Sequence, residues 1–170
     1  MNQDIQILKE RARITAKEAA ADNKASGSSL MLVEFLLFPE TYAIEAEFVK
    51  EVLTLKDITP IPGTPDFVMG VINFRGEIIS VVNLKNLFGL KEKGLTEMNK
   101  VLLLRNEQMA FGLVADAIIG SKQTQRDELS EPPLTLSKTT ADFVNGTMGN
   151  GTIVLSAERL LSSEKLTVNQ

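Results

Sequence analysis

Residues 66–88 read DFVMGVINFRGEIISVVNLKNLF, and this stretch carries the clearest structural pattern in the chain. Two runs rich in β-branched and apolar residues, 71–74 and 78–82, flank the tripeptide Arg75-Gly76-Glu77. Such runs favour β-strands, and a glycine between them can adopt the positive φ that a tight hairpin requires. The pattern predicts a hairpin, followed by a short helical turn that ends at Gly89.

The beginning of this stretch recurs once, 76 residues later in the chain. Asp66-Phe67-Val68-Met69-Gly70 matches Asp142-Phe143-Val144-Asn145-Gly146, and each copy precedes a glycine turn, an apolar strand and a leucine-containing turn. An internal repeat of this kind indicates two copies of one strand-rich unit. Many short strands with Gly and Pro turns favour small barrels, and two small barrels gain stability by burying a shared apolar interface.

The remaining strands are also short. We expect strands at 32–38 and 42–46, then an extended connector at 58–65 whose three prolines prevent regular pairing. Residues 65–68 resemble a brief helical turn. In the second half, 101–104 and 109–114 are typical of a hairpin, and the polar stretch 121–140 is typical of a loop.

Further along, Asn150-Gly151 predicts a last hairpin. A final amphipathic turn contains Leu160 and Leu161.

The first 29 residues differ from the rest. Apolar residues recur there at steps of three and four, namely Ile5, Leu8, Ala12, Ala16 and Ala19. We therefore expect a helical or flexible tail over 1–29 that a Gly-Ser joint connects to a strand-rich domain over 30–168. Within that domain, the changeover between the two units is expected near 90–100.

Composition narrows the chemistry. The chain has no cysteine and no histidine, so it lacks thiolate nucleophiles, histidine bases and the usual zinc ligands. We expect no metal and no cofactor, although enzymes built on carboxylates or lysine pass this test. The net charge of −4 and a pI near 5.0 disfavour nucleic-acid binding. No apolar run approaches the roughly 20 residues needed to cross a bilayer, and the N-terminus lacks a secretory signal, so we expect a cytoplasmic protein without membrane insertion.

The hairpin region resembles the signature of the CheW family. The most specific element is G-V-I-N-x-R-G-x-I-I-x-V-V-N-L, supplied here by Gly70 through Leu84. The connector ITPIPGTP and the segment Phe111-Gly112-Leu113-Val114-Ala115-Asp116 are also similar to family features, and the resemblance extends from about Leu32 to Leu166.

The resemblance implies an all-β fold of two interlocked five-stranded SH3-like barrels with short helical turns and no active site. It implies a chemotaxis adaptor that couples methyl-accepting receptors to the regulatory domain of the histidine kinase CheA and supports receptor arrays at the membrane. For receptor binding, the family uses a groove between the barrels. By residue-level match, the candidate coupling residues are Val49, Glu51, Gly70, Arg75, Val101 and Gly112. Among these, Val49 and Val101 also fit a core position, and Arg75 fits either partner contact or bracing of its own hairpin.

Several alternatives stay open. A CheV-like coupling domain would need a receiver domain, for which only a few residues remain after residue 168. An isolated regulatory-domain-like module of CheA is also compatible with the length. From other classes, the chain fits less well as a carboxylate-dependent hydrolase that uses Glu77 with Asp66 or Glu51, or as a nucleic-acid-binding barrel.

Overall fold

We analysed a computed structural model of the chain, which describes residues 9, 29–90, 99–164 and 166. The predicted tail at 1–29 therefore lies almost entirely outside the described residues. The strands are β1 (Ser29–Leu37), β2 (Glu40–Glu45), β3 (Val49–Thr54), β4 (Val68–Phe74), β5 (Glu77–Val82), β6 (Lys100–Arg105), β7 (Ala110–Ala115), β8 (Ala117–Gln125), β9 (Val144–Thr147) and β10 (Ile153–Leu155). The helices are α2 (Leu84–Phe88), α3 (Lys138–Ala141) and α4 (Ala157–Ser162), with 3-10 turns at Ala46–Phe48 and Arg126–Glu128.

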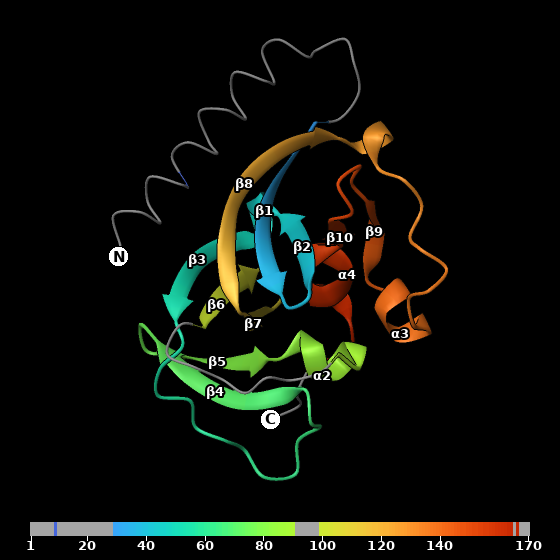
Figure 1. The fold of residues 1–170 in the computed structure, drawn as a ribbon. Coiled ribbons are helices and arrows are strands. Elements are labelled where there is room, and N and C mark those ends of the chain that lie inside the picture. Colours follow the sequence, from blue (N-terminus) through green and yellow to red (C-terminus); the bar gives the residue numbers. More distant parts are fainter. Residues whose placement is uncertain (1–8, 10–28, 91–98, 165, 167–170) are drawn as a thin grey trace.

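The strands form two five-stranded sheets. Sheet A has the order β8-β1-β2-β10-β9, and sheet B has the order β3-β6-β7-β5-β4. In Figure 1, β8 arches beside β1 in sheet A, and the β4–β5 hairpin of sheet B lies at the opposite end of the molecule. This mostly-β architecture agrees with the predicted pair of SH3-like barrels.

The two sheets exchange hairpins. Strands β1–β5 and β6–β10 are the two sequence units, but sheet A combines the β1–β2 hairpin with β8, β9 and β10. Sheet B combines the β6–β7 hairpin with β3, β4 and β5. In both sheets the hairpin meets the other unit on two sides. One side is an antiparallel pair, β1 with β8 and β6 with β3, and the other is a parallel pair, β2 with β10 and β7 with β5. Each barrel thus contains strands from both halves of the chain, so the two barrels are interlocked.

Equivalent hydrogen bonds support the internal repeat. The carbonyl of Phe67 accepts from the Asn83 N–H at 2.7 Å, and the carbonyl of Phe143 accepts from the Ser156 N–H at 2.8 Å. The side chains of Asn83 and Ser156 then accept backbone N–H groups at the starts of α2 and α4. Such N-caps satisfy donors that the first helical turn leaves unpaired. The matching pentapeptides at 66–70 and 142–146 therefore begin the same substructure twice.

The largest apolar cluster lies between the sheets, as expected for barrels that share an interface. It includes residues of both sheets and of α2 and α4, among them Phe35, Tyr42, Phe88, Leu113 and Leu160. Tyr42 stacks between Phe35 and Phe88, with ring centroids 6.2 and 6.0 Å apart. Smaller clusters fill sheet B and sheet A separately. Most residues of the buried apolar clusters therefore belong to the one that the two sheets share.

One local prediction is wrong and another holds only in part. The polar stretch 121–140 is not all loop, because 121–125 belong to β8 and 138–141 form α3. As an edge strand, β8 has a single neighbouring strand and largely exposed side chains, so it tolerates polar residues that mask the strand pattern. Residues 65–68 form a single turn, in which the Val68 N–H donates to the Pro65 carbonyl at 2.9 Å, and the chain continues into β4 at Val68 instead of into a helix.

The other predicted strands, the helical turns and the Gly151 hairpin are confirmed with small shifts at their ends. The expected changeover near 90–100 falls mostly on 91–98, outside the described residues. This region separates strands β1–β5 from strands β6–β10 in the sequence. The chain passes from one sheet to the other at different places, at Ala46–Phe48 and at Asp116. Within the described part of the chain, no helix has the length and apolar character needed to cross a membrane.

Candidate functional site

The β4–β5 turn presents an arginine in an unusual backbone conformation. Arg75 has φ 52° and Gly76 has φ 83°, so both central residues of this two-residue turn are left-handed. A turn of this type matches the right-handed twist of the strands that it joins. The Gly76 N–H donates to Asn73 Oδ1 at 3.0 Å, which fixes the turn from within. Sequence reasoning identified the role of Gly76 but not the positive φ of Arg75.

The Arg75 side chain extends toward β3. Its guanidinium lies 4.8 Å from the centre of the Phe74 ring, and Nη2 lies 3.9 Å from Glu51 Oε2. The side chain of Arg75 is 78% exposed and that of Glu51 is 26% exposed. A loose and solvated ion pair contributes little to stability. Arg75 therefore remains available to a partner, with the Glu51 carboxylate beside it.

A second ion pair lies beside the first. Arg105, at the end of β6, pairs with Glu77, at the start of β5. Ile78, the next residue, has 54% of its surface exposed. We call Glu51, Arg75, Glu77, Ile78 and Arg105 the tip surface. It combines alternating charges with one exposed aliphatic side chain, which suits a protein contact with a polar rim.

Two of the carboxylates named for the hydrolase alternative, Glu77 and Glu51, lie next to arginines in the structure. Glu77 is paired with Arg105, whereas Glu51 is approached by Arg75. Within the described residues, no cluster of acidic, histidine or cysteine side chains could hold a metal ion. The carboxylates on the tip surface are therefore arranged as ion-pair partners.

Gly70 packs against the proline-rich connector. Thr59 and Val71 exchange two backbone hydrogen bonds of 2.9 Å, which lay the connector across β4. A Cβ at residue 70 would overlap the Thr59 carbonyl oxygen, and the φ of 145° also disfavours side chains. Gly146 repeats this packing, because its added Cβ would lie 2.6 Å from the Ser130 carbonyl oxygen. Gly70 thus sets the position of the connector and contributes no side chain to the surface.

The other three candidate residues are buried. Val49 joins the shared cluster between the sheets, whereas Val101 belongs to the core of sheet B. A Cβ on Gly112 would lie 2.6 Å from Val101 Cγ1, so these two residues fit one tight space inside the sheet. Of the six candidates, only Glu51 and Arg75 place a side chain at the surface. A partner-binding role for the other four residues stays a prediction. Such a role would be indirect, through the shape that their packing gives to the tip surface.

Sequence reasoning missed a buried ion pair that joins the two sheets. Lys85 Nζ, on α2, lies 2.7 Å from Asp116 Oδ2, and the Lys85 side chain is 3% exposed. The same Oδ2 accepts the Phe38 N–H at 2.8 Å, while Oδ1 accepts Asn99 Nδ2 at 3.2 Å. Asp116 stands at the end of the quoted FGLVAD segment, but nothing in its spacing indicated Lys85 as a partner.

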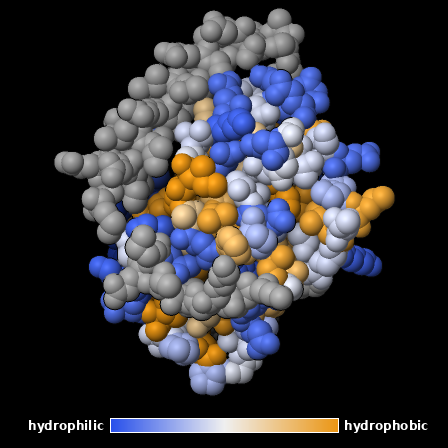
Figure 2. Space-filling view, in the orientation of Figure 1, coloured by the Kyte–Doolittle hydropathy of each residue, from blue (hydrophilic) through white to orange (hydrophobic). Residues whose placement is uncertain are grey.

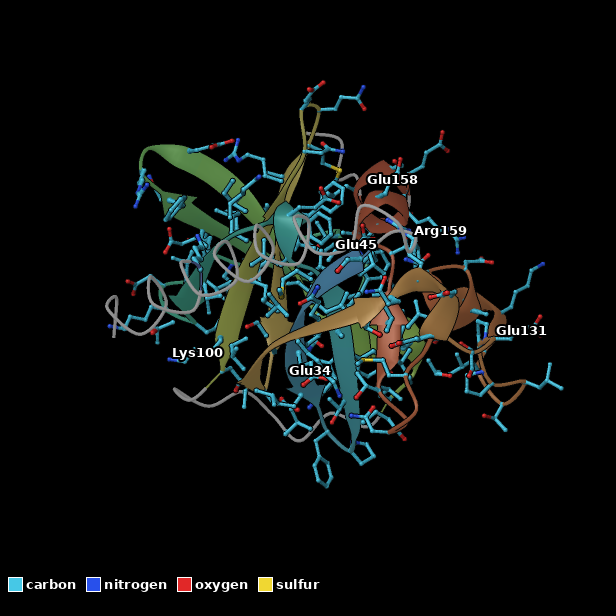
Figure 3. All side chains as sticks on the ribbon, turned by 90° about the horizontal axis from the view of Figure 1, so that it is seen from above. Glu34, Glu45, Lys100, Glu131, Glu158 and Arg159 are labelled. Atoms are coloured by element: carbon cyan, nitrogen blue, oxygen red, sulfur yellow. The ribbon has the colours of Figure 1, made fainter. Side chains whose placement is uncertain are left out.

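A second carboxylate, that of Glu45, is buried at the other end of the β1–β2 hairpin. Glu45 is 7% exposed, and burial raises its pKa above the ordinary value, with the nearby Glu47 adding to the effect. Figure 3 shows Glu45 near α4, from which Glu158 and Arg159 project. Asn145 Nδ2 donates to Glu45 Oε1 at 3.5 Å. This hydrogen bond connects β2 to β9.

Apolar side chains also reach the surface. Figure 2 shows them in several places on the visible face, in its middle, toward its right edge and at its lower end, with hydrophilic residues between them. The large exposed apolar side chains of the described residues are Phe38, Ile78, Ile119 and Leu134. They lie in different elements, with Ile119 on the edge strand β8 and Ile78 on β5.

Comparisons with known proteins agree on one relationship. The family model described as CheW-like domain matches residues 32–165. The chain is 33% identical over 142 residues to the chemotaxis protein CheW of Treponema pallidum, covering 79% of this chain and 84% of that protein. It is 28% identical over 141 residues to the chemotaxis protein CheW of Klebsiella aerogenes, covering 79% and 85%.

The structure is similar to a solved one. The crystal structure of the scaffolding protein TtCheW from Thermoanaerobacter tengcongensis superposes with a TM-score of 0.67 and 28% sequence identity. The match covers 78% of this chain and 86% of that chain.

Proposed function

The chain belongs to the CheW family and is a chemotaxis adaptor, and on that premise we propose that it couples chemotaxis receptors to the histidine kinase CheA. The observation that carries this proposal is the family match over residues 32–165, which includes both sheets. The relatives named as CheW are covered over 84% and 85% of their length, which supports an adaptor over a regulatory module of the kinase.

We assign the receptor contact to the tip surface. It presents two opposite charges to a partner, the exposed guanidinium of Arg75 and the carboxylate of Glu51, with 3.9 Å between Nη2 and Oε2. Arginine presents several rigid donors to carboxylates and carbonyls of a partner. Gly70, Val101 and Gly112 support this surface from within the sheet, and Val49 supports it from the shared core.

The proposed activity is assembly, without catalysis, cofactor or metal. The adaptor would work in the cytoplasm, with recruitment to membrane arrays occurring through the receptor tip and the regulatory domain of CheA. Kinase contacts are assigned to the ends of the two barrels and receptor contacts to the tip surface, so that both partners bind at once.

Co-sedimentation with receptor-containing vesicles tests the proposal. The purified chain and the CheA regulatory domain are mixed with vesicles that carry the receptor cytoplasmic tip, and each pair of components is compared with the ternary mixture. We expect the regulatory domain to sediment only when both the chain and the receptor are present. Equal sedimentation of the regulatory domain without the chain contradicts coupling.

Surface variants locate the receptor contact. Arg75→Ala and Glu51→Ala are expected to reduce sedimentation of the chain with the receptor. Lys50→Ala is the matched control, because Lys50 is an exposed neighbour on β3 whose ammonium donates to the Glu47 carbonyl at 3.0 Å. Equal loss in all three variants contradicts the assignment to the tip surface.

A further inference from the structure

One carboxylate oxygen on the tip surface is approached by two cations from different parts of the chain. Glu51 Oε2 lies 3.9 Å from Arg75 Nη2 and also 3.9 Å from Lys9 Nζ. The Lys9 side chain is 31% exposed, so the contact is partly shielded from water. Within residues 1–28 the structure describes Lys9 alone, and that residue is placed against the tip surface.

The sequence around Lys9 suits this position. Residues 9–17 contain four basic residues, Lys9, Arg11, Arg13 and Lys17, and one acidic residue, Glu10, in a chain of net charge −4. The predicted apolar stripe of the tail includes Ile5, Leu8 and Ala12. On either side of Glu51 in the sequence, Phe48 and Val52 are only partly buried and offer apolar surface. Glu51 therefore offers a carboxylate to Lys9, and Phe48 and Val52 offer apolar area close to it.

Covalent linkage makes a weak contact effective. An exposed ion pair between separate molecules holds little population, but a tethered segment meets its site at a high local concentration. Residues 1–28 are joined directly to β1 at Ser29. The segment therefore needs only a modest intrinsic affinity to occupy its site for much of the time.

We propose that Lys9 binds Glu51 of the same chain and competes there with the receptor tip. The competition rests on the proposed function, whereas the contact between Lys9 and Glu51 does not. Binding of Lys9 lowers the fraction of molecules whose Glu51 and Arg75 are open to a receptor, and the apparent receptor affinity falls by that fraction.

Paramagnetic broadening tests the contact between Lys9 and Glu51 without any partner. The chain has no cysteine, so Glu10→Cys carries a single nitroxide label beside Lys9. We expect the amide signals of Lys50, Glu51 and Val52 to broaden in the oxidised label and to recover on its reduction. Lys9→Glu should abolish the broadening, and Lys24→Glu, a charge reversal closer to β1, should leave it. The double reversal Lys9→Glu with Glu51→Lys should restore it.

Three results overturn this contact. The first is that the signals of β3 do not broaden. The second is that Lys9→Glu leaves the broadening unchanged, and the third is that the broadening arises between molecules. The last is detected by mixing isotope-labelled chain without nitroxide and unlabelled chain with nitroxide, where a contact within one chain predicts no effect.

Receptor binding tests the competition. Affinity for an isolated receptor tip is expected to rise about two- to fivefold in Lys9→Glu, the range that one exposed ion pair produces. It should rise at least as much on deletion of residues 1–28 and stay unchanged in Lys24→Glu. Unchanged affinity in the deletion overturns the competition. If no form binds any receptor tip, the proposed function fails, and the broadening still decides the contact between Lys9 and Glu51.

Discussion

Lys85 Nζ lies 2.7 Å from Asp116 Oδ2, and this ion pair connects α2 to the point where the chain passes from sheet B to sheet A. The lysine is almost fully buried, and the carboxylate also accepts hydrogen bonds from Phe38 N and Asn99 Nδ2. A buried charge that loses its partner is much more costly than a broken surface pair.

Removal of the carboxylate should therefore weaken the whole fold. We expect Asp116→Ala to lower the free energy of unfolding by about 3–5 kcal/mol, because Lys85 is left buried and unpaired. Denaturant unfolding followed by circular dichroism measures the loss. Asp127→Ala is the control, since Asp127 is exposed in the 3-10 turn Arg126–Glu128 and should change little. Equal stability of the two variants contradicts the role of Asp116.

Gly70 and Gly146 should both lose stability when a methyl group is added. Gly70→Ala and Gly146→Ala place a Cβ against the carbonyl oxygens of Thr59 and Ser130, so each should cost about 1–3 kcal/mol. Gly70→Ala should cost more, because its φ of 145° adds backbone strain. Gly149→Ala, where nothing lies within 4 Å of the added Cβ, should keep the wild-type melting temperature. A neutral Gly146→Ala refutes the structural equivalence of the two repeats.

Val101 and Gly112 should show strong energetic coupling. Gly112→Ala alone pushes its Cβ against Val101 Cγ1, so we expect a loss of about 1–3 kcal/mol from overpacking. In Val101→Ala with Gly112→Ala the clashing methyl group is gone, and the double variant should lose less stability than the sum of the single ones. A double-mutant cycle measures the coupling, expected at about 0.5–3 kcal/mol. Additive losses would show that the two residues do not share one space.

The only tyrosine of the chain offers a spectroscopic test of the shared core. Burial, with a smaller contribution from Glu40, raises the pKa of Tyr42 from 10.0 to about 12. The fold thus favours the neutral phenol, and this stabilisation is complete below about pH 10 and is lost as the pH rises through 12. An ultraviolet titration should show tyrosinate appearing near pH 12 or together with unfolding. Ionisation near pH 10 in a folded protein contradicts the packing between Phe35 and Phe88.

The sequence predicted the strand-rich class, the repeat and the main hairpins because these depend on local patterns. The runs 71–74 and 78–82 are rich in β-branched and apolar residues and flank a glycine turn, and this pattern can be read without the rest of the chain. The exchange of hairpins between units depends on long-range pairing, such as Ser80 with Phe111 and Ile153 with Tyr42. Local periodicity carries no information about such partners.

The site was predictable only in part for the same reason. Glu51 and Arg75 were identified through a family motif, and their 3.9 Å separation came from the way the β4–β5 hairpin approaches β3. Burial of Val101 and Gly112 could not be separated from groove contact, since an apolar or small residue fits both. The strand at 121–125 was missed because an exposed edge strand has no apolar alternation to detect.

Kinase autophosphorylation in reconstituted receptor complexes tests the central claim most directly. Full-length CheA and receptor vesicles are assayed without the chain, with it, and with Arg75→Ala or Arg75→Gly. Both substitutions should remain folded, and Arg75→Gly should be at least as stable as Arg75→Ala, because glycine accepts the φ of 52° at this turn. We predict that kinase activity depends on the chain and falls in both variants while their melting temperatures stay near wild type. Kinase activity that is the same with and without the chain would contradict the coupling function.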